Sequence, residues 1–442
     1  MTDLEKLLGN YKLVLGLEIH LHIRTKTKMF CGCDADIYDQ EPNTHTCPVC
    51  LGLPGALPVP NLEAIKKTQI LGLALNCRLN RNSNFDRKHY FYPDLPKGYQ
   101  ISQYKYPLCE EGYVMLSNNI KAEIERIHLE EDTAKSFHTK EGTLIDFNMS
   151  GMPLIEIVTK PIFTDPKDAV EFSKKIADVV RFLELGDVDM EKGQMRLEAN
   201  ISLRTPEMER LDELPNYKVE VKNINSFRFM EKAVLAEIVR QREILEKGGI
   251  VRQENRGWNE ELKTTVSQRD KEDAHDYRYF PEPDIPPMEF SNEYIEELKA
   301  QIPEMPDEIC QRLIKQFNLK KQSAKELSSG SGLLLLAEFE ILCSFGYDPN
   351  TVANLLLNKR EFRGLSVEEF DKKLNDLATS VSDEDLLAPI VEKVLEENPK
   401  AIQDYKSGKL SSVEFLLGQV KRYTRGKANA ETTRKLILKQ LS

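Results

Sequence analysis

The sequence lacks several features that would assign it to well-known classes. It has no apolar run that approaches the roughly 20 residues needed to span a bilayer. Residues 1–11 lack the basic and then apolar segments of a signal peptide. There is no Gly-x-x-x-x-Gly-Lys-Ser/Thr loop, so ATP would not bind as it does in P-loop enzymes. We therefore expect a soluble, cytoplasmic protein that does not contact a membrane.

Basic residues are in the minority, 61 against 72 acidic residues, which gives a net charge of −11. This balance argues against a general polyanion-binding surface, so any contact with nucleic acid must come from a local basic patch. Residues 401–442 form such a patch, with nine basic and three acidic residues and a net charge of +6. Its sequence is consistent either with binding to the phosphates of an RNA backbone or with a small basic helical bundle. The candidate RNA-binding residues are Lys421, Arg422, Arg425 and Lys427.

The chain is long enough for two or three domains. Residues 10 to about 290 mix short strand-like segments with glycines and turns, and they contain all seven histidines and the single tryptophan, Trp258. From about residue 291 the apolar positions follow a helical period with charged faces. We therefore expect an α+β fold in which a mixed-strand catalytic part precedes a helical part.

Residues 13–23 alternate strictly between two kinds of side chain. Every odd position is apolar, and the even positions include Gly16, Glu18, His20 and His22. A period of two predicts a β-strand with one buried face. The carboxylate and the two imidazoles beside a glycine favour the floor of a polar cavity, although a solvated strand face has the same pattern.

Four of the eight cysteines form two close pairs, Cys31 with Cys33 and Cys47 with Cys50. Two pairs separated by a short polar loop are typical of a structural zinc site with four thiolate ligands. His45 is an alternative to one of the cysteines. A redox role for Cys47 and Cys50 is a second interpretation, but it leaves the first pair unexplained.

Acidic residues recur on two further strand-like segments. Glu130, Glu131 and Asp132 are adjacent and would repel one another unless a cation neutralises them, and Glu156 stands among apolar residues that would bury it. Hard cations prefer carboxylate oxygens and often bind together with substrate phosphates. The residues of our predicted Mg²⁺ site are Glu18, His20, Glu131 and Glu156.

Basic and polar side chains suited to a phosphorylated or acylated substrate lie between and after these acids. Lys88 and Lys97 belong to the segment 85–100, which is also rich in aromatic residues. In the segment 196–204 alternation places five polar residues on one strand face, Glu198 among them. This face indicates a lined cavity or channel, with a solvated sheet edge as the alternative.

With these segments the sequence resembles the GatB family, the B subunit of the glutamyl/aspartyl-tRNA amidotransferase, over nearly its whole length. The resemblance rests on the cysteine quartet and on the matching segments Gly16–His20, Leu51–Gly55, Asp86–Gln103, His128–Asp132, Pro153–Val158, Glu220–Phe227, Glu254–Trp258, His275–Asp284 and Thr424–Asn429. The archaeal relative GatE carries an inserted synthetase-like domain, for which this chain has no room. Met149 and Lys160 stand where the family often has an arginine and an acid, respectively. The resemblance therefore does not predict the local charge at these two positions.

The resemblance implies a mechanism. Family members phosphorylate the side-chain carboxylate of Glu-tRNA(Gln) or Asp-tRNA(Asn) with ATP and Mg²⁺, and ammonia then displaces the phosphate. By this resemblance Glu18, His20, Glu131 and Glu156 would hold Mg²⁺, whereas Lys88, Lys97 and Glu198 would line a polar passage for ammonia, with Glu131 also catalytic. Which of the two tRNAs is used depends on the synthetases that mischarge them.

The resemblance also implies partners and domains. No serine-lysine amidase signature is present, so ammonia would come from an amidase subunit, GatA, braced by the small GatC in a heterotrimer. A cradle domain with the zinc loop would span residues 1–290, a helical domain 291–378 and a basic tail domain 379–442 that contacts tRNA. Two alternatives remain: a non-catalytic zinc-containing tRNA-binding protein, and a self-sufficient ligase that uses free ammonia.

Overall fold

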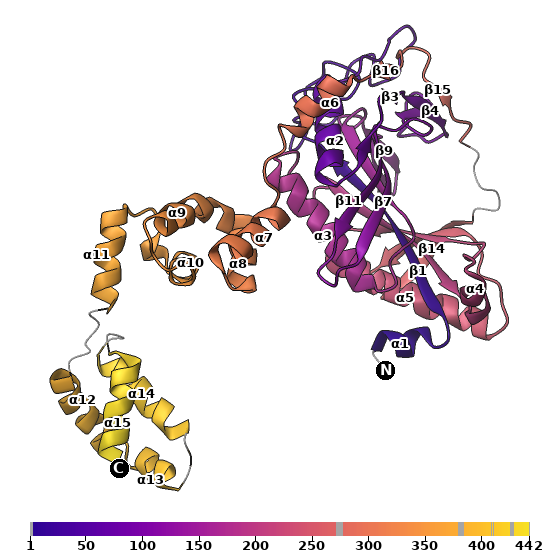
Figure 1. Ribbon diagram of the computed structural model, residues 1–442. Coiled ribbons are helices and arrows are strands. Elements are labelled where there is room, and N and C mark those ends of the chain that lie inside the picture. The colour runs from indigo at the N-terminus through magenta and orange to yellow at the C-terminus, as the bar shows by residue number, and fades with distance from the viewer. Residues whose placement is uncertain are drawn as a thin grey trace. The chain divides into compact units, whose positions relative to one another are not determined.

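The structure is a computed structural model that describes residues 3–270, 277–378, 384–407, 409, 411–424 and 428–441. The chain divides into two compact units, Met1–Glu308 and Ile309–Ser442 (Figure 1). The first unit is built on a large mixed sheet, and in the second the described elements are helices. This confirms the predicted α+β class. No helix in the described part of the chain is long and apolar enough to cross a membrane.

A nine-stranded sheet forms the centre of the first unit. Its neighbours are antiparallel except for one parallel pair, β12 with β13. In spatial order the strands are β14 (Thr264–Asp270), β13 (Glu254–Asn259), β12 (Val219–Ile224), β11 (Met195–Arg204), β1 (Lys12–His22), β10 (Pro153–Thr159), β7 (Lys121–Glu131), β6 (Cys109–Met115) and β2 (Arg78–Leu79).

Strand β1 occupies the centre of this sheet and confirms the predicted alternation. Its odd-numbered apolar side chains are at most 2% exposed, from Leu13 to Leu21. Its even-numbered face is not a solvated one, because His22 is 5% exposed and the His20 side chain 16% exposed. The strand therefore has a hydrophobic face and a separate, largely enclosed polar face.

Helices cover the hydrophobic face. The long helix α3 (Pro166–Phe182) packs on β1. Its neighbour α5 (Phe227–Glu246) packs on α3 and on the strands β11 and β12. Each begins at a side-chain cap: Asp165 accepts from the Lys167 N–H, and Ser226 accepts from the Phe229 N–H. The other helices of this unit are α1 (Asp3–Leu8), α2 (Leu62–Ala74), α4 (Pro206–Leu211) and α6 (Asn292–Lys299), and α7 (Pro306–Phe317) crosses the boundary between the units.

Three small sheets complete the described part of the first unit. One has three strands in the order β15 (Phe280–Pro281), β4 (Asp86–His89) and β5 (Tyr99–Ser102). The others are the pairs β16 (Met288–Glu289) with β3 (Asn82–Ser83) and β8 (Lys135–Thr139) with β9 (Gly142–Asp146). The three-stranded sheet matters for function, because β4 and the turn before β5 carry two predicted site residues, Lys88 and Lys97.

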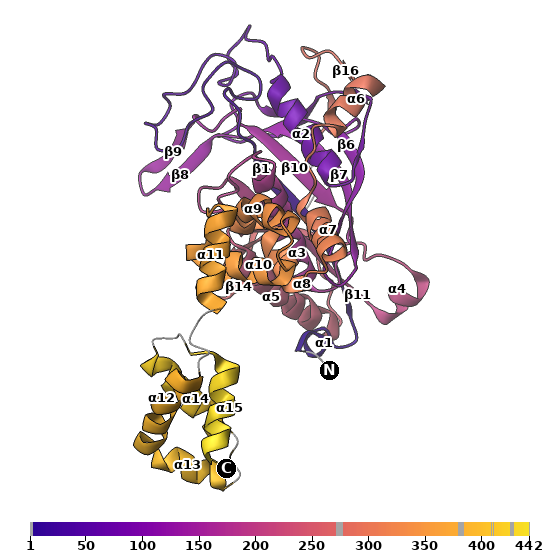
Figure 2. The ribbon, with the colours of Figure 1, turned by 60° about the vertical axis from the view of Figure 1, so that its left-hand side comes forward.

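The second unit is helical in its described residues, as the period from about residue 291 predicts (Figure 2). A separate hydrophobic cluster joins its last four helices, with Val391, Leu416 and Ile437 fully buried. The elements are α8 (Lys321–Leu327), η1 (Gly330–Gly332), α9 (Leu333–Ser344), α10 (Pro349–Asn358), η2 (Arg360–Phe362), α11 (Val367–Ala378), α12 (Glu384–Glu397), α13 (Pro399–Lys406), α14 (Ser411–Tyr423) and α15 (Ala430–Leu441).

Candidate active site and metal centres

One face of the large sheet carries a row of polar side chains across five adjacent strands, β12, β11, β1, β10 and β7. The strand register aligns them. His20 lies opposite Arg196 on one side and Glu156 on the other, and Glu156 lies opposite His128. We call this set the polar row, and its members are Glu220, Lys222, Arg196, Glu198, Asn200, Glu18, His20, His22, Glu156, His128 and Glu130.

At the β10–β7 side, the polar row contains two carboxylates and two imidazoles in contact, which we call the acidic centre. His20 Nε2 lies 3.5 Å from Glu156 Oε2 and 3.8 Å from Glu130 Oε1. His128 Nε2 lies 3.2 Å from the same Glu156 oxygen, and the Ser102 hydroxyl donates to Glu130 Oε2 at 2.9 Å. The two glutamate side chains are at most 8% exposed, so their charges must be balanced inside the protein.

The pKa values in the acidic centre show how its negative charge is balanced. Burial raises the pKa of Glu156, but His128 and His20 lower it well below its usual range. Burial lowers the pKa of His20, but nearby carboxylates, Glu156 above all, raise it to about 9. Burial also lowers the pKa of Lys88, but Glu130 and Glu156 raise it well above its usual value. The centre therefore attracts positive charge.

The acidic centre fits a hard divalent cation. One ligand atom from each of His20, Glu130 and Glu156 lies within 4.8 Å of the others. Ligands of one Mg²⁺ ion lie about 3–4 Å apart, because each is about 2.1 Å from the ion. Among the ion pairs of the described residues, the partners of both carboxylates are histidines. The structure thus brings two of the four predicted Mg²⁺ residues together, His20 and Glu156, and adds Glu130.

Glu131, a third predicted Mg²⁺ residue, lies elsewhere. Because successive residues of a strand point to opposite faces, its side chain leaves β7 on the other side from Glu130. Lys97 Nζ donates to Glu131 Oε2 at 2.6 Å, and the Ile101 N–H donates to Oε1 at 2.9 Å. Residues of the segment 91–98, including Lys97, line a cavity of about 530 Å³. The structure therefore pairs two predicted catalytic residues, Glu131 and Lys97, beside an open cavity.

Glu18, the fourth predicted Mg²⁺ residue, belongs to a separate cluster in the polar row. Its carboxylate lies within 4.8 Å of those of Glu198 and Glu220. Lys222 Nζ balances this cluster at 2.9 Å from Glu198 and 2.8 Å from Glu220, and Asn200 donates to Glu18 at 2.8 Å. Burial raises the pKa of Glu198 and Lys222 lowers it, but the effect of burial is larger, so the pKa lies above its usual value. Glu198 is thus largely enclosed, with a side chain that is 16% exposed.

Two residues of the polar row, His22 and Arg196, join Asp132 in a buried group that was not predicted from the sequence. His22 Nε2 lies 2.7 Å from Asp132 Oδ2, and its Nδ1 lies 3.0 Å from the Tyr38 hydroxyl. Arg196 also hydrogen bonds to Asp132. Burial raises the pKa of Asp132, but Arg196 and His22 lower it far below its usual range. The alternation of His128, Glu130 and Asp132 was the available signal, because a period of two separates these residues from Glu131.

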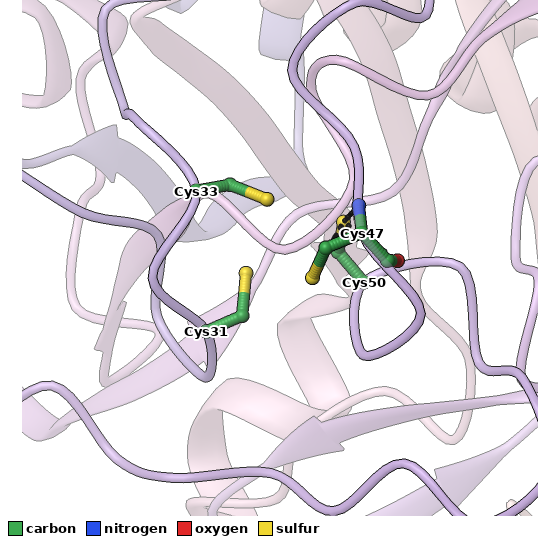
Figure 3. A group of neighbouring side chains, drawn as sticks. All are labelled: Cys31, Cys33, Cys47 and Cys50. Atoms are coloured by element: carbon green, nitrogen blue, oxygen red, sulfur yellow. Dashed lines mark hydrogen bonds between the residues drawn. The ribbon is translucent and has the colours of Figure 1, made fainter.

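The four predicted zinc ligands meet in the cysteine loop, residues 24–61, which joins β1 to α2. Figure 3 shows the thiols of Cys31, Cys33, Cys47 and Cys50 turned toward one another, and all four sulfur atoms lie within 4.8 Å. The Cys47 and Cys50 sulfurs are 3.9 Å apart, close to the about 3.8 Å expected for tetrahedral zinc with Zn–S bonds of about 2.3 Å. The alternative ligand His45 is not in this group and instead lies 3.1 Å from the Thr44 hydroxyl.

The remaining predicted residues are on the surface or in a minor core. Lys421 and Arg422 lie exposed in the last turn of α14, while Arg425 and Lys427 lie outside the described residues. Lys160 forms an exposed ion pair with Glu123 at 3.5 Å. Met149 packs against a small hydrophobic cluster that includes Ala35 and Ile37 of the cysteine loop. The charge of Lys160 is therefore balanced locally, and Met149 has a packing role.

Comparison with known proteins identifies the class and then the family. Residues 13–296 match the model of the GatB/GatE catalytic domain, and residues 364–441 match that of the GatB domain. The chain is therefore of the GatB/GatE class. Within this class it belongs to the GatB family, as predicted.

Curated relatives agree over almost the full length. Proteins named as the B subunit of aspartyl/glutamyl-tRNA(Asn/Gln) amidotransferase from Thermotoga petrophila and Thermodesulfovibrio yellowstonii are 43% and 40% identical to this chain. A protein of the same name from a Thermoanaerobacter species is 39% identical. Each alignment covers 98% of this chain and 99% of the relative.

Proposed function

We propose that the chain is the GatB component of a multi-subunit enzyme that converts Glu-tRNA(Gln) to Gln-tRNA(Gln), or Asp-tRNA(Asn) to Asn-tRNA(Asn). The proposal is that it phosphorylates the side-chain carboxylate with ATP and replaces the phosphate by ammonia. Membership of the GatB family over nearly the whole chain supports this function. The acidic centre is the observation that carries it, because two buried carboxylates and an imidazole converge there and offer ligand atoms to a divalent cation.

The reaction explains why such a centre is needed. A free carboxylate is a poor acyl donor, because its leaving group would be oxide, whereas the acyl phosphate loses phosphate. The phosphoryl group in transfer carries negative charge, which positive groups must stabilise. His20, Glu130 and Glu156 would hold Mg²⁺, which supplies charge neutralisation when it is bound. Glu130 and Glu156 raise the pKa of Lys88, so Lys88 stays protonated. Its ammonium is available to an anionic substrate.

Ammonia requires a different environment from ATP. The proposed passage and acceptor residues are Lys88 and Glu198, on the side of the polar row, and the Lys97–Glu131 pair, on the other side of β7. The Lys97–Glu131 pair is enclosed on one side of β7, and its carboxylate can take the proton that the attacking ammonia loses. Glu18 and Glu131, which are also predicted Mg²⁺ residues, are hydrogen bonded to neighbours away from the acidic centre.

The partners and the substrate-binding surface are part of the same proposal. An amidase subunit, GatA, would release ammonia from glutamine, and a small subunit, GatC, would complete a heterotrimer. A cytoplasmic location follows, because charged tRNA and ATP are available there. The three predicted domains, 1–290, 291–378 and 379–442, keep their proposed roles, and the exposed Lys421 and Arg422 of the tail support contact with tRNA phosphates.

The decisive experiment compares Glu130→Gln with Glu123→Gln in the complete complex. Glu123 is on the same strand, but its side chain is 40% exposed and pairs with Lys160, so its substitution is a matched control. With charged tRNA, ATP, Mg²⁺ and ammonia, we expect Glu130→Gln to lower amide-tRNA formation by at least about 100-fold. The control should stay near wild type, and tRNA binding should be unchanged in both.

Other results would select the alternatives. If the wild-type complex binds tRNA but consumes no ATP with ammonia or glutamine, the chain is a non-catalytic zinc-containing tRNA-binding subunit. If the isolated chain forms amide-tRNA from ammonia as fast as the complex does, it is a self-sufficient ligase. Equal activity of Glu130→Gln and Glu123→Gln would contradict the role of the acidic centre.

A further inference from the structure

The cysteine loop touches the Lys97–Glu131 pair directly. Gly52, two residues after Cys50, has a φ of +65° and packs on the backbone of Lys97. A Cβ atom at this position would lie 3.2 Å from both the N and the Cα atoms of Lys97. The Cγ atom of Lys97 would lie nearer still, at 2.5 Å, so the contact involves the main chain of Lys97 and the first part of its side chain. The position of the loop therefore fixes where the Lys97 side chain begins.

A second contact reaches Glu131 from the other side of the pair. The Ser150 hydroxyl donates to the Cys50 carbonyl at 3.0 Å, and the next residue, Gly151, lies between the loop and Glu131. A Cβ on Gly151 would lie 3.3 Å from Cys50 Cβ and 3.9 Å from Glu131 Oε2. The Gly151 N–H also donates to the Asp132 carbonyl at 2.9 Å. The segment that follows Cys50 and the segment that holds Glu131 are therefore in one packed layer.

A fully buried lysine ties this layer to the thiols. Lys28 is 0% exposed, and its ammonium donates to the Ser150 carbonyl at 2.9 Å and lies 3.9 Å from Cys50 Sγ. A buried ammonium requires a compensating negative charge. Four cysteine thiolates around one Zn²⁺ would carry a formal charge of −2, so the set of donors suits both the metal and Lys28.

From these contacts we propose that the cysteine loop, when it holds zinc, is the positioning element for the Lys97–Glu131 pair. Gly52 packs on Lys97, and Gly151, next to the residue that donates to the Cys50 carbonyl, packs against the carboxylate of Glu131. The metal centre thereby acts on ammonia transfer without touching any reactant. The catalytic part of this inference rests on the proposed role of the pair, whereas the mechanical part can be tested without activity.

Two glycines of the same loop provide a matched test. Gly55 also has a positive φ, +85°, but has nothing within 4 Å of its would-be Cβ atom, so Gly55→Ala introduces backbone strain without the contact. Both variants of the complete complex should retain about one zinc per chain. We expect Gly52→Ala to lose at least about tenfold in kcat/KM for ammonia, because small displacements of reacting groups are costly. Gly55→Ala should stay close to wild type, and an equal effect in both would overturn the proposal.

Coupling between the two sites also changes the affinity for zinc, because coupling free energies are reciprocal. Breaking the pair with Lys97→Met should weaken zinc binding, measured at equilibrium by competition with a chromogenic chelator, by at least about fivefold, with Glu123→Gln as an unchanged control. An unaltered zinc affinity in Lys97→Met would overturn the mechanical link, even where Gly52→Ala fails to fold. If Lys97→Met binds zinc more weakly but keeps full ammonia-dependent activity, the link stands and the proposed catalytic role of the pair is wrong.

Discussion

At the residue scale, the polar row depends on charged groups whose partners come from other strands. Asp132 is the clearest example, because its carboxylate binds His22 from β1 and Arg196 from β11. Its side chain is 4% exposed, so solvent offers little compensation if a partner is lost. A charge-assisted contact of this kind contributes more to stability than an exposed ion pair does.

We predict that Asp132→Asn lowers the free energy of unfolding by about 2–3 kcal/mol near neutral pH, the cost of a lost hydrogen bond to a charged group. The folded-state pKa of Asp132 is depressed, so its contribution is present above the unfolded-state pKa of about 3.9 and is lost as the pH falls toward the folded-state value. The deficit of the variant should therefore shrink below about pH 4. Urea unfolding at a series of pH values measures it.

Asp212→Asn is the control for this measurement. Asp212 has a 96% exposed side chain and faces Arg204 at 3.6 Å, so its removal should change stability very little. A deficit for Asp132→Asn that is equally large at pH 3 and pH 7 would show that lost packing, and not the carboxylate charge, is responsible.

Individual residues of the polar row also differ in how far the sequence predicts their positions. Alternation on β1 correctly predicted an enclosed polar face with Glu18, His20 and His22. The same rule applied to residues 128–132 separates Glu130 from Glu131, which the structure places in two different groups. Which neighbouring strands meet is set by long-range pairing, so the composition of each cluster could not be predicted from local pattern alone.

At the element scale, the cysteine loop is anchored at its start, where Met29 and Phe30 enter the main core, but has no strand or helix of its own. Beyond Phe30 its hydrophobic contacts include a minor core, Ala35 and Ile37 with Met152. Four convergent thiols can supply the missing order through a metal. The sequence predicted the grouping of these thiols, because the ligands of a structural zinc site are close in the chain and their spacing is diagnostic.

We predict that Cys33→Ser lowers the zinc content well below one ion per chain and the melting temperature of the first unit by at least about 5 °C, since a structural metal contributes its binding energy to folding. Elemental analysis and calorimetry measure the two effects. Cys343→Ser, in α9 of the helical unit, is the control and should keep its zinc. Full zinc occupancy in Cys33→Ser would remove that residue from the ligand set.

The β-strands differ in how far the sequence predicts them. A long alternating strand such as β1 is predictable from its period, whereas two-residue strands such as β3 and β15 have no period to detect. The three-stranded sheet that presents Lys88 brings residues 86–102 together with residues 280–281. Contacts over such a separation leave no local signal, so the position of Lys88 beside Glu130 and Glu156 required the structure.

At the scale of the whole molecule, the charge is divided between the parts. The chain has a net charge of −11, yet residues 401–442 carry +6. The described helices of this segment have their own hydrophobic core, in which Leu416, Val420 and Ile437 are fully buried. The described basic residues of this segment, such as Lys421 and Arg422, are therefore on the surface of a folded helical bundle, an arrangement that suits contact with a polyanion.

We predict that the double variant Lys421→Ala/Arg422→Ala weakens binding of charged tRNA by the complete complex while leaving its maximal rate near wild type. Each lost phosphate contact reduces the number of counterions that are released on binding. The slope of log K against log salt should therefore fall in magnitude by about 1–2 units. Filter binding from low to moderate salt measures this slope.

The matched control is Lys6→Ala/Arg181→Ala, which removes the same charges from exposed positions in the first unit. If both double variants change the slope equally, attraction by overall charge and not a tail-specific contact binds the tRNA. If neither changes it, the tail is only a basic helical bundle, and the RNA-binding residues must be sought elsewhere in the chain.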